Sequence, residues 1–246
     1  MSERPEFPPL YRPFAVTPEL DPFERALGIA KEGAEAGTLL WSIGQDACEC
    51  AVVLAPEHSL EKSLPVVLVA LLGLGDALGS LATPVVAVTF GWPDRIEVNG
   101  GVVGGVRMAH APIDAPSAVP DWMVIGFAVA MRGSWAAKQP GDRLLRTTLA
   151  DEGCGEIQTL DLLEALTRHF LAWMNRWQDD GVGPVQQAWM SRATGLGKSV
   201  EVGVGGQMRQ GTFTGLTESG AIRLVKEGVT QTISLEDAMK VPSWSA

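Results

Sequence analysis

The dipeptide Asn99-Gly100 constrains the fold of this chain more than any other short feature of its sequence. Both central residues of a type I′ turn need a positive φ angle, which asparagine and glycine adopt readily, so the pair predicts a two-residue β-hairpin. Apolar residues flank the pair, Ile96 and Val98 on one side and Val102 and Val103 on the other. The segment therefore predicts two antiparallel strands with apolar faces, and the charged stretch "GWPDR", residues 91–95, leads into the first of them.

The rest of the chain divides into two unequal parts. Residues 21–24 have the pattern of a capped helix start, with an N-cap aspartate, a proline in the first turn and a glutamate three residues after the cap. Residues 65–81 predict a buried helix, and residues 158–181 place apolar side chains at helical spacing. From Gly195 onward, short alternating runs are separated by glycine turns, which is typical of a small β-barrel.

We therefore predict an α+β fold in two domains. Residues 1–194 form a mixed β-sheet with helices, and residues 195–246 form a small SH3-like barrel. The first twenty residues are proline-rich and are expected to lie extended over the surface.

Charge and hydropathy argue against several classes of partner. The net charge is −10, and residues 195–246 hold as many bases as acids, so the preceding segment carries the whole excess of acid. Nucleic-acid binding needs clustered Lys and Arg, so we expect no nucleic-acid partner. The most apolar run, 64–75, is shorter than the about 20 residues that span a bilayer. The N-terminal segment also lacks the apolar core of a signal peptide, so we expect a cytoplasmic protein without a membrane partner.

Two common kinds of site are not indicated. Cys48, Cys50 and Cys154 form no recognised ligand spacing with the three histidines, so we expect reduced core cysteines and no metal. The glycine clusters at 100–105 and 203–206 lie in predicted hairpins rather than between a strand and a helix, which excludes the common phosphate-binding loops.

Three features in order resemble the biotin protein ligases and, more loosely, the lipoate ligases. They are "GWPDRIEVNGGVVGGV", then "VIGFAVAM", then a helix followed by the small barrel. In that family the hairpin begins Lys-Trp-Pro-Asn-Asp, its second strand contains Ala-Gly, and a later strand reads Ile-Gly-x-Gly-x-Asn. Trp92, Pro93, Gly105 and Gly126 fall at matching places.

The resemblance implies a fold and a reaction. The fold is that of the class II aminoacyl-tRNA synthetase and biotin ligase type of catalytic domain. The reaction joins a small carboxylic acid to ATP as an acyl-adenylate and then transfers the acyl group to a lysine of a carrier domain. It would use ATP and Mg²⁺ as cofactors, if activity is retained.

The charged groups of the family are missing from matching positions here. Gly91 stands where the family has a lysine before Trp-Pro, and Asp94-Arg95 replaces Asn-Asp. The lipoate-ligase lysine falls at about Val102, and the closing asparagine falls at Ala130. Adenylate formation needs cationic or amide donors where negative charge concentrates, so these changes predict that the adenylation machinery is degenerate.

The segments that enclose the ligand in biotin ligases also differ. The arginine- and glycine-rich loop of that family has no counterpart, because only residues 45–47 separate Gly44 from the next strand. The Ser-Thr-Asn helix entry is represented by residues 21–23, "DPF".

Two arginines are candidates for the missing cation. Arg107 lies on the second hairpin strand and is the candidate substitute for the lysine, because a guanidinium binds carboxylate or phosphate in bidentate fashion. Arg95 is the other candidate; alternatively, both are surface arginines that balance Asp94 and Glu97. The predicted substrate-binding residues are Trp41, Trp92, Asp94, Arg95, Gly104, Gly105, Arg107 and Gly126.

These observations leave three functions open. The leading one is a ligase-like protein that binds a small carboxylic acid, such as biotin or lipoate, or an acyl-carrier domain, without adenylation. The second is an active, divergent ligase or acyltransferase in which Arg107 replaces the lysine. The third is a structural or interaction protein that forms a homodimer.

Overall fold

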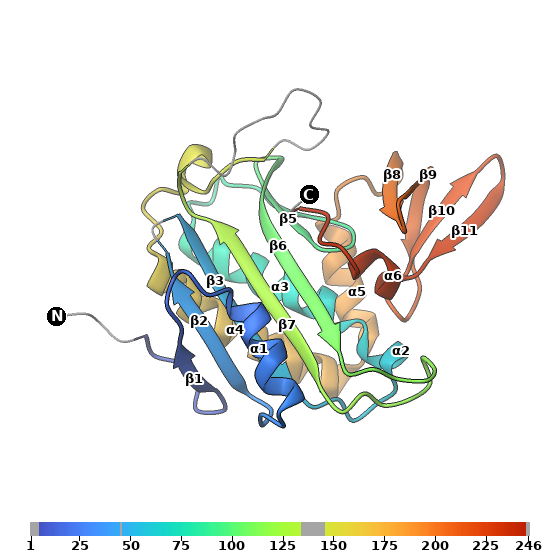
Figure 1. The fold of residues 1–246 in the computed structure, drawn as a ribbon. Coiled ribbons are helices and arrows are strands. Elements are labelled where there is room, and N and C mark those ends of the chain that lie inside the picture. Colours follow the sequence, from blue (N-terminus) through green and yellow to red (C-terminus); the bar gives the residue numbers. More distant parts are fainter. Residues whose placement is uncertain (1–4, 45, 134–145, 245–246) are drawn as a thin grey trace.

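The computed structural model describes residues 5–44, 46–133 and 146–244, which form two β-sheets with helices around them (Figure 1). The larger sheet has seven strands in the order β1-β2-β3-β7-β6-β5-β4. Its strands are β1 Arg12–Ala15, β2 Thr38–Ile43, β3 Ala47–Leu54, β4 Val88–Gly91, β5 Arg95–Val98, β6 Gly101–His110 and β7 Met123–Ala130. All neighbours pair antiparallel except β1 and β2, which are parallel, so the sheet is mixed as predicted.

The hairpin predicted from Asn99-Gly100 is confirmed. Asn99 has a φ of 50° and Gly100 a φ of 86°, and these two residues join β5 to β6. The N-terminal segment was predicted only to lie extended over the surface. In the structure four of its residues form β1 at one edge of the sheet.

Helices cover both faces of the large sheet. The helices are α1 Pro22–Lys31, α2 Leu60–Ser63, α3 Val66–Leu81, α4 Thr159–Asp180, α5 Val182–Ser191 and α6 Leu235–Met239, with a π-helical turn at Ala150–Cys154. Figure 1 shows α1 in front of the sheet and α3 and α4 behind it. The start of α1 is as predicted, because the Asp21 side chain accepts a hydrogen bond from the Phe23 backbone N–H.

The apolar helix α3 lies in the core, as predicted. By length and composition alone, the segment Leu60–Leu81 is able to cross a membrane, but 78% of its most apolar window is buried inside the protein. It packs closely on α4: a Cβ added at Gly73 would lie 2.7 Å from the Cα of Phe170. Glycine at this position therefore permits the close approach of the two helices.

The smaller sheet has four antiparallel strands in the order β11-β10-β9-β8. They are β8 Ser199–Val204, β9 Gln207–Leu216, β10 Ile222–Lys226 and β11 Val229–Ile233, close to the predicted runs. Trp189 of α5 joins the two sheets, because its ring lies 6.0 Å from that of Phe90 on β4 and 6.4 Å from that of Phe213 on β9. The predicted boundary near residue 194 stays a prediction.

The cysteines are free and buried, as predicted. Burial raises the pKa of the Cys48 thiol to about 12, with a smaller contribution from Glu49, so this thiol is a poor nucleophile at neutral pH. Among the described residues, no group of three His, Cys, Asp or Glu side chains is arranged to hold a metal ion.

Candidate functional site

Three of the predicted substrate-binding residues, Gly105, Arg107 and Gly126, lie on the face of the large sheet that α1 covers in part. Gly105 of β6 pairs with Ala128 of β7, and Arg107 pairs with Gly126. Because alternate residues of a strand share a face, all four point to the same side. Phe127, between them in the sequence, points to the opposite side and packs on Phe170 of α4. We call the side of Gly105, Arg107, Gly126 and Ala128 the hairpin face.

Trp41, Trp92 and Gly104 do not lie on the hairpin face, and Gly104, which pairs with Val129, points to the opposite side from Gly105. Trp41 pairs with Cys50, which pairs with Phe127, so the Trp41 side chain lies on the side of the sheet that α3 and α4 cover. Its ring is 6.0 Å from that of Phe7. Trp92 is buried and donates from its indole Nε1 to the Gly220 carbonyl at 2.9 Å. The Trp92 side chain therefore ties the hairpin to the smaller sheet.

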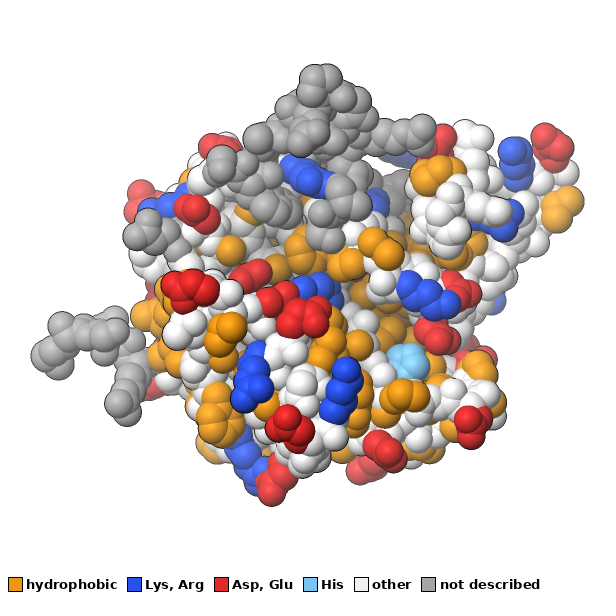
Figure 2. Space-filling view, in the orientation of Figure 1, with side chains coloured by type: hydrophobic (Ala, Val, Ile, Leu, Met, Phe, Trp, Pro, Cys, Tyr) orange, Lys and Arg blue, Asp and Glu red, His pale blue; other side chains and the backbone are white. Residues whose placement is uncertain are grey.

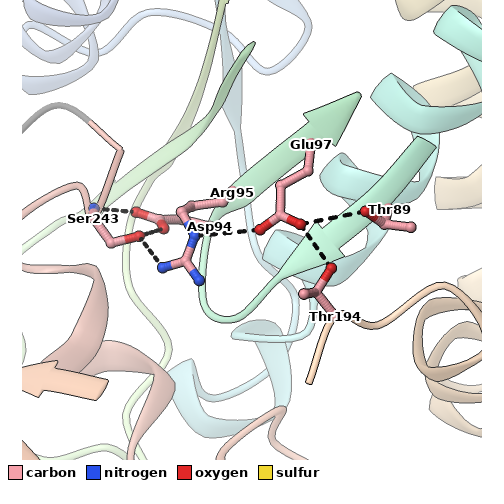
Figure 3. Close-up of polar contacts among 6 residues, drawn as sticks. All are labelled: Thr89, Asp94, Arg95, Glu97, Thr194 and Ser243. Atoms are coloured by element: carbon pink, nitrogen blue, oxygen red, sulfur yellow. Dashed lines mark hydrogen bonds and ion pairs between the residues drawn. The ribbon is translucent and has the colours of Figure 1, made fainter. Parts of the chain in front are cut away.

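Asp94 is fully buried at the mouth of the hairpin and binds the C-terminal tail of the chain (Figure 3). The backbone N–H of Ser243 donates to Asp94 Oδ2 at 2.8 Å, and the Ser243 hydroxyl donates to Asp94 Oδ1. That hydroxyl also accepts from Arg95 Nη1 at 3.2 Å. Burial raises the pKa of Asp94 to about 6, although the hydrogen bonds from Ser243 act in the opposite direction.

The space beside Gly91 is filled by an ion pair. Arg95 Nε lies 3.8 Å from Glu97 Oε1, which agrees with the alternative that this arginine balances Glu97. Glu97 is buried and accepts hydrogen bonds from Thr194 at 2.7 Å and Thr89 at 3.3 Å (Figure 3). A Cβ added at Gly91 would lie 2.7 Å from Arg95 Nε and 2.8 Å from Glu97 Oε1. A lysine at this position would therefore require both side chains to move.

Arg107 is bound to Asp21 rather than to Asp94 or Glu97. Its Nη1 and Nη2 donate to the two carboxylate oxygens of Asp21, each at 2.7 Å. The guanidinium also stacks over Phe23, 4.5 Å from the ring centroid. Phe23 in turn covers Gly126, where an added Cβ would lie 2.5 Å from the ring. Side chains of α1 thus occupy the hairpin face above Gly126 and hold the charge of Arg107.

Among the residues that the structure describes, acid exceeds base around Arg107 on the hairpin face. Glu49 of β3 pairs with Ala128 and therefore points to the same side. Burial raises the pKa of Glu49, the charge of Asp21 adds to this, and Arg107 opposes it. Partial burial raises the pKa of Asp21, but hydrogen bonds and charge from Arg107 outweigh it and leave a net lowering. Figure 2 shows a mosaic of acidic, basic and apolar side chains here rather than a basic patch.

Trp244 covers the other half of the hairpin face. Its indole Nε1 donates to the Val106 carbonyl at 3.2 Å, and the ring packs with Val102 and Ala128. A Cβ added at Gly105 would lie 2.1 Å from the Asp94 carbonyl oxygen and 2.5 Å from that nitrogen, so glycine is needed here both beside the Asp94 backbone and under the ring. Gly104 has no room for a side chain either, because the backbone of β7 lies against it.

Several of these residues were missed by the sequence analysis. Asp21 was recognised only as a helix cap, and nothing in the local pattern of Ser243 and Trp244 marks them as part of a site. Arg146 was also missed; it forms a parallel β-bridge with Val102, and its Nε is buried without a hydrogen-bond partner. The bridge brings a cationic residue beside the position of the lipoate-ligase lysine.

The β2–β3 connection is short, as predicted. Strand β2 ends at Ile43 and β3 begins at Ala47, and Gln45 lies outside the described residues. The hairpin face therefore receives no long loop from this connection.

The structure also contains a cavity of about 740 Å³ away from the hairpin face. It lies between the N-terminal segment, α2 and the end of α4, and its walls include Met123, Phe170, Met174 and Trp177. None of the predicted site residues lines it.

Comparisons with known proteins agree with this architecture. The model of the biotin/lipoate A/B protein ligase family matches residues 7–191. The chain belongs to this family. Among its curated relatives, the biotin–[acetyl-CoA-carboxylase] ligase of Paracoccus denitrificans is 27% identical over 173 residues, which are 70% of this chain and 71% of the relative.

Solved structures of the biotin/lipoate ligase family share the whole fold. A biotin protein ligase-like protein of unknown function from Silicibacter sp. TM1040 is 33% identical, with a TM-score of 0.86 over 96% of this chain and 99% of the other. The biotin protein ligase of Aquifex aeolicus in complex with biotin and ATP is 17% identical, with a TM-score of 0.67 over 90% of this chain and 94% of the other. The predicted family and fold class are thus confirmed.

The two predicted cations do not fit the phosphates of ATP in this arrangement. Arg107 is held by Asp21, and Arg95 is held between Glu97 and Ser243. A phosphate would have to displace these partners.

Proposed function

We propose that this chain is a member of the biotin/lipoate ligase family that binds an acyl group without activating it with ATP. The bound form is an acyl group in uncharged linkage, such as the acyl-lysine of a carrier domain. The observation that carries the proposal is the bidentate ion pair of Arg107 with Asp21, which neutralises the candidate catalytic cation.

The charges around the hairpin face support an uncharged ligand. Adenylation would concentrate negative charge on an acyl carboxylate and an α-phosphate, and preorganised positive charge would have to stabilise it. The Arg107–Asp21 pair instead carries no net charge, and Glu49 and Asp94 add carboxyl groups on this face or at its edge. A free carboxylate would be repelled by them, whereas an amide carries no net charge and offers an N–H donor to acceptors.

The relatives support an acyl group as the class of ligand. One structural neighbour, the Aquifex aeolicus protein, binds biotin and ATP, and the Paracoccus denitrificans relative is a ligase for acetyl-CoA carboxylase. We infer that the present chain retains recognition of a similar acyl group or of its carrier. The predicted homodimer stays a prediction, which light scattering after size-exclusion chromatography measures.

Calorimetry with matched pairs of ligands tests the proposal. The pairs are biotin and biotinyl-lysine amide, lipoate and lipoamide, and octanoate and octanamide, each titrated at pH 8, where the free acids are ionised. We expect at least one amide to bind about tenfold more tightly than its acid, because the acid adds a charge to an acidic face. Equal or tighter binding of every free acid would contradict the proposal.

An assay of pyrophosphate release separates the proposal from the second candidate, an active divergent ligase. The bridge between Arg146 and Val102 favours that candidate, because it brings a cationic residue near the expected lysine position. We expect no release above background with ATP, Mg²⁺ and any acid of the panel. Pyrophosphate release that Arg146→Ala abolishes, and that the control Arg176→Ala at an exposed position retains, would instead establish an active ligase.

A further inference from the structure

The C-terminal tail, which we define as residues 242–244, runs from the end of α6 to the mouth of the β5–β6 hairpin (Figure 1). Its two last described residues both contact residues that the sequence analysis had assigned to substrate binding. Ser243 contacts Asp94 and Arg95, and Trp244 lies against Gly105. The tail therefore covers half of the hairpin face.

The tail donates three hydrogen bonds to the hairpin. Two donors of Ser243 reach the two oxygens of a fully buried carboxylate, and the indole N–H of Trp244 reaches a backbone carbonyl of β6. A strand interior rarely offers a side chain a free carbonyl. Here the β5–β6 pairing begins with Arg95 opposite Gly105, and Val106 lies beyond it, where its N–H donates to the Asp94 carbonyl at 2.9 Å. The Val106 carbonyl therefore lies where the β5 ladder has ended.

The apolar contacts are shaped for a flat ring. A Cβ on Gly105 would overlap the indole ring as well as the Asp94 carbonyl, and Ala128 and Val102 are small enough to leave the ring lying against the sheet. Only 6% of the Trp244 surface remains exposed. The same glycine that falls at the Ala-Gly position of the biotin ligases thus serves, in this chain, as the floor for a tryptophan.

We propose that the C-terminal tail is an intramolecular ligand, which occupies the hairpin face and must leave before an acyl group enters. The second part of this statement rests on the proposed function. The tail shows which chemistry the face accepts: a planar ring with an N–H donor beside a second group that donates to Asp94. Occupation by the tail and binding of an acyl group are then mutually exclusive.

Chemical rescue of the full-length Trp244→Ala variant tests whether the indole occupies a real binding site. Removing the ring leaves a ring-sized space, so we expect the variant to melt at lower temperature and added indole to raise that temperature. Indole is expected to leave the wild type unchanged. The probe 1-methylindole, which lacks the N–H, is expected to bind the variant about fivefold more weakly because it cannot donate to Val106.

Val241→Ala is the matched control, because this neighbouring side chain is 66% exposed. We expect it to melt like the wild type and to show no response to indole. Should Trp244→Ala fail to fold, Trp244→Phe keeps a ring and loses the N–H, and is expected to accelerate hydrogen exchange in residues 94–107. A Trp244→Ala variant that melts like Val241→Ala and ignores indole, or a Trp244→Phe variant with unchanged exchange, would overturn the proposal.

Ligand titration separates this proposal from the function on which it rests. If the tail blocks entry, Trp244→Ala is expected to bind the best amide of the calorimetry panel at least tenfold more tightly than wild type or Val241→Ala. Indole rescue without this gain would keep the tail as an intramolecular ligand and contradict acyl binding at the hairpin face. Tighter amide binding by Trp244→Ala, without stabilisation of this variant by added indole, would contradict a specific binding site for the indole ring on the hairpin face.

Discussion

The strength of the ion pair between Arg107 and Asp21 tells whether Arg107 stabilises the folded protein or is free to bind a ligand. Two substitutions, Arg107→Ala and Asp21→Ala, and their combination form a double-mutant cycle. Asp21 also caps α1 by accepting from the Phe23 N–H at 2.8 Å, so its removal has a second cost. Arg107 also stacks on Phe23, so its removal loses that contact as well.

The geometry sets the expected magnitudes. Hydrogen bonds to charged groups contribute about 1.5–3 kcal/mol in buried sites, whereas exposed ion pairs contribute about 0–1 kcal/mol. The Arg107 and Asp21 side chains are 16% and 35% exposed, so we assign the pair about 2 kcal/mol between these limits. The cap and the stacking each contribute about 1 kcal/mol. Each single variant is then expected to lose about 3 kcal/mol, the double variant about 4 kcal/mol, and the coupling energy is about 2 kcal/mol.

Urea unfolding followed by circular dichroism at pH 7 measures these values. The Asp21 pKa is lowered in the folded state, so its contribution is fully present above the ordinary value of 3.8 and is lost as the pH falls through the lower folded value. Repeating the cycle at low pH should therefore shrink the coupling. The exposed Arg176→Ala variant, which removes an i,i+4 pair with Asp180, is the control and is expected to lose less than about 1 kcal/mol. A coupling energy below about 0.5 kcal/mol at pH 7 would refute the reasoning, because Arg107 would then be available to a ligand.

Two further predictions concern buried positions. Burial raises the pKa of Asp94 from 3.8 to about 6, because the charged form is less stable inside the protein. The free energy of unfolding of the wild type, relative to that of Asp94→Asn, is therefore expected to rise by up to about 3 kcal/mol as the pH falls from 7 through 6 to below 4. Unfolding curves of both proteins measured across this range check the sign, and a difference that stays flat or falls speaks against it. Gly73→Ala is expected to destabilise by more than about 2 kcal/mol, because the new methyl overlaps the α4 backbone at Phe170. Gly79→Ala in the same helix is exposed, meets nothing within 4 Å and is expected to stabilise by up to about 1 kcal/mol, so equal effects in thermal unfolding would count against close α3–α4 packing.

Many elements of the fold could be read from local patterns, but no helix was predicted at α2, α5 or α6. The Asn99-Gly100 turn, the cap of α1, the apolar helix α3 and the four short C-terminal strands each depend on residues within one turn or one strand of each other. Strand β1 was missed because "RPFA" has no alternation, and its hydrogen bonds depend on β2 lying beside it. An edge strand formed mainly by a neighbour leaves little trace in its own sequence.

The candidate site was less predictable because its contacts join residues that are far apart in the chain. Arg107 lies on the second hairpin strand, as predicted, but its partner, Asp21, is 86 residues away and had been assigned only to a helix cap. Asp94 was placed in the site, yet its donor, Ser243, is 149 residues away. Trp41 was assigned to the site through its strand, and only the register of β2, β3 and β7 shows that it points to the other side.

By itself, the sequence determined the family and many of the elements, because turns, caps and periodicity depend on neighbouring residues and on the backbone preferences of each side chain. It also showed directly that position 91 holds glycine where the family has a lysine. Only the tertiary structure decided what the remaining charges do. Whether Arg107 faces a ligand or a carboxylate, and whether Gly105 lies under a substrate or under Trp244, depends on which distant segments pack together. Those contacts follow from the burial of whole faces rather than from any local pattern.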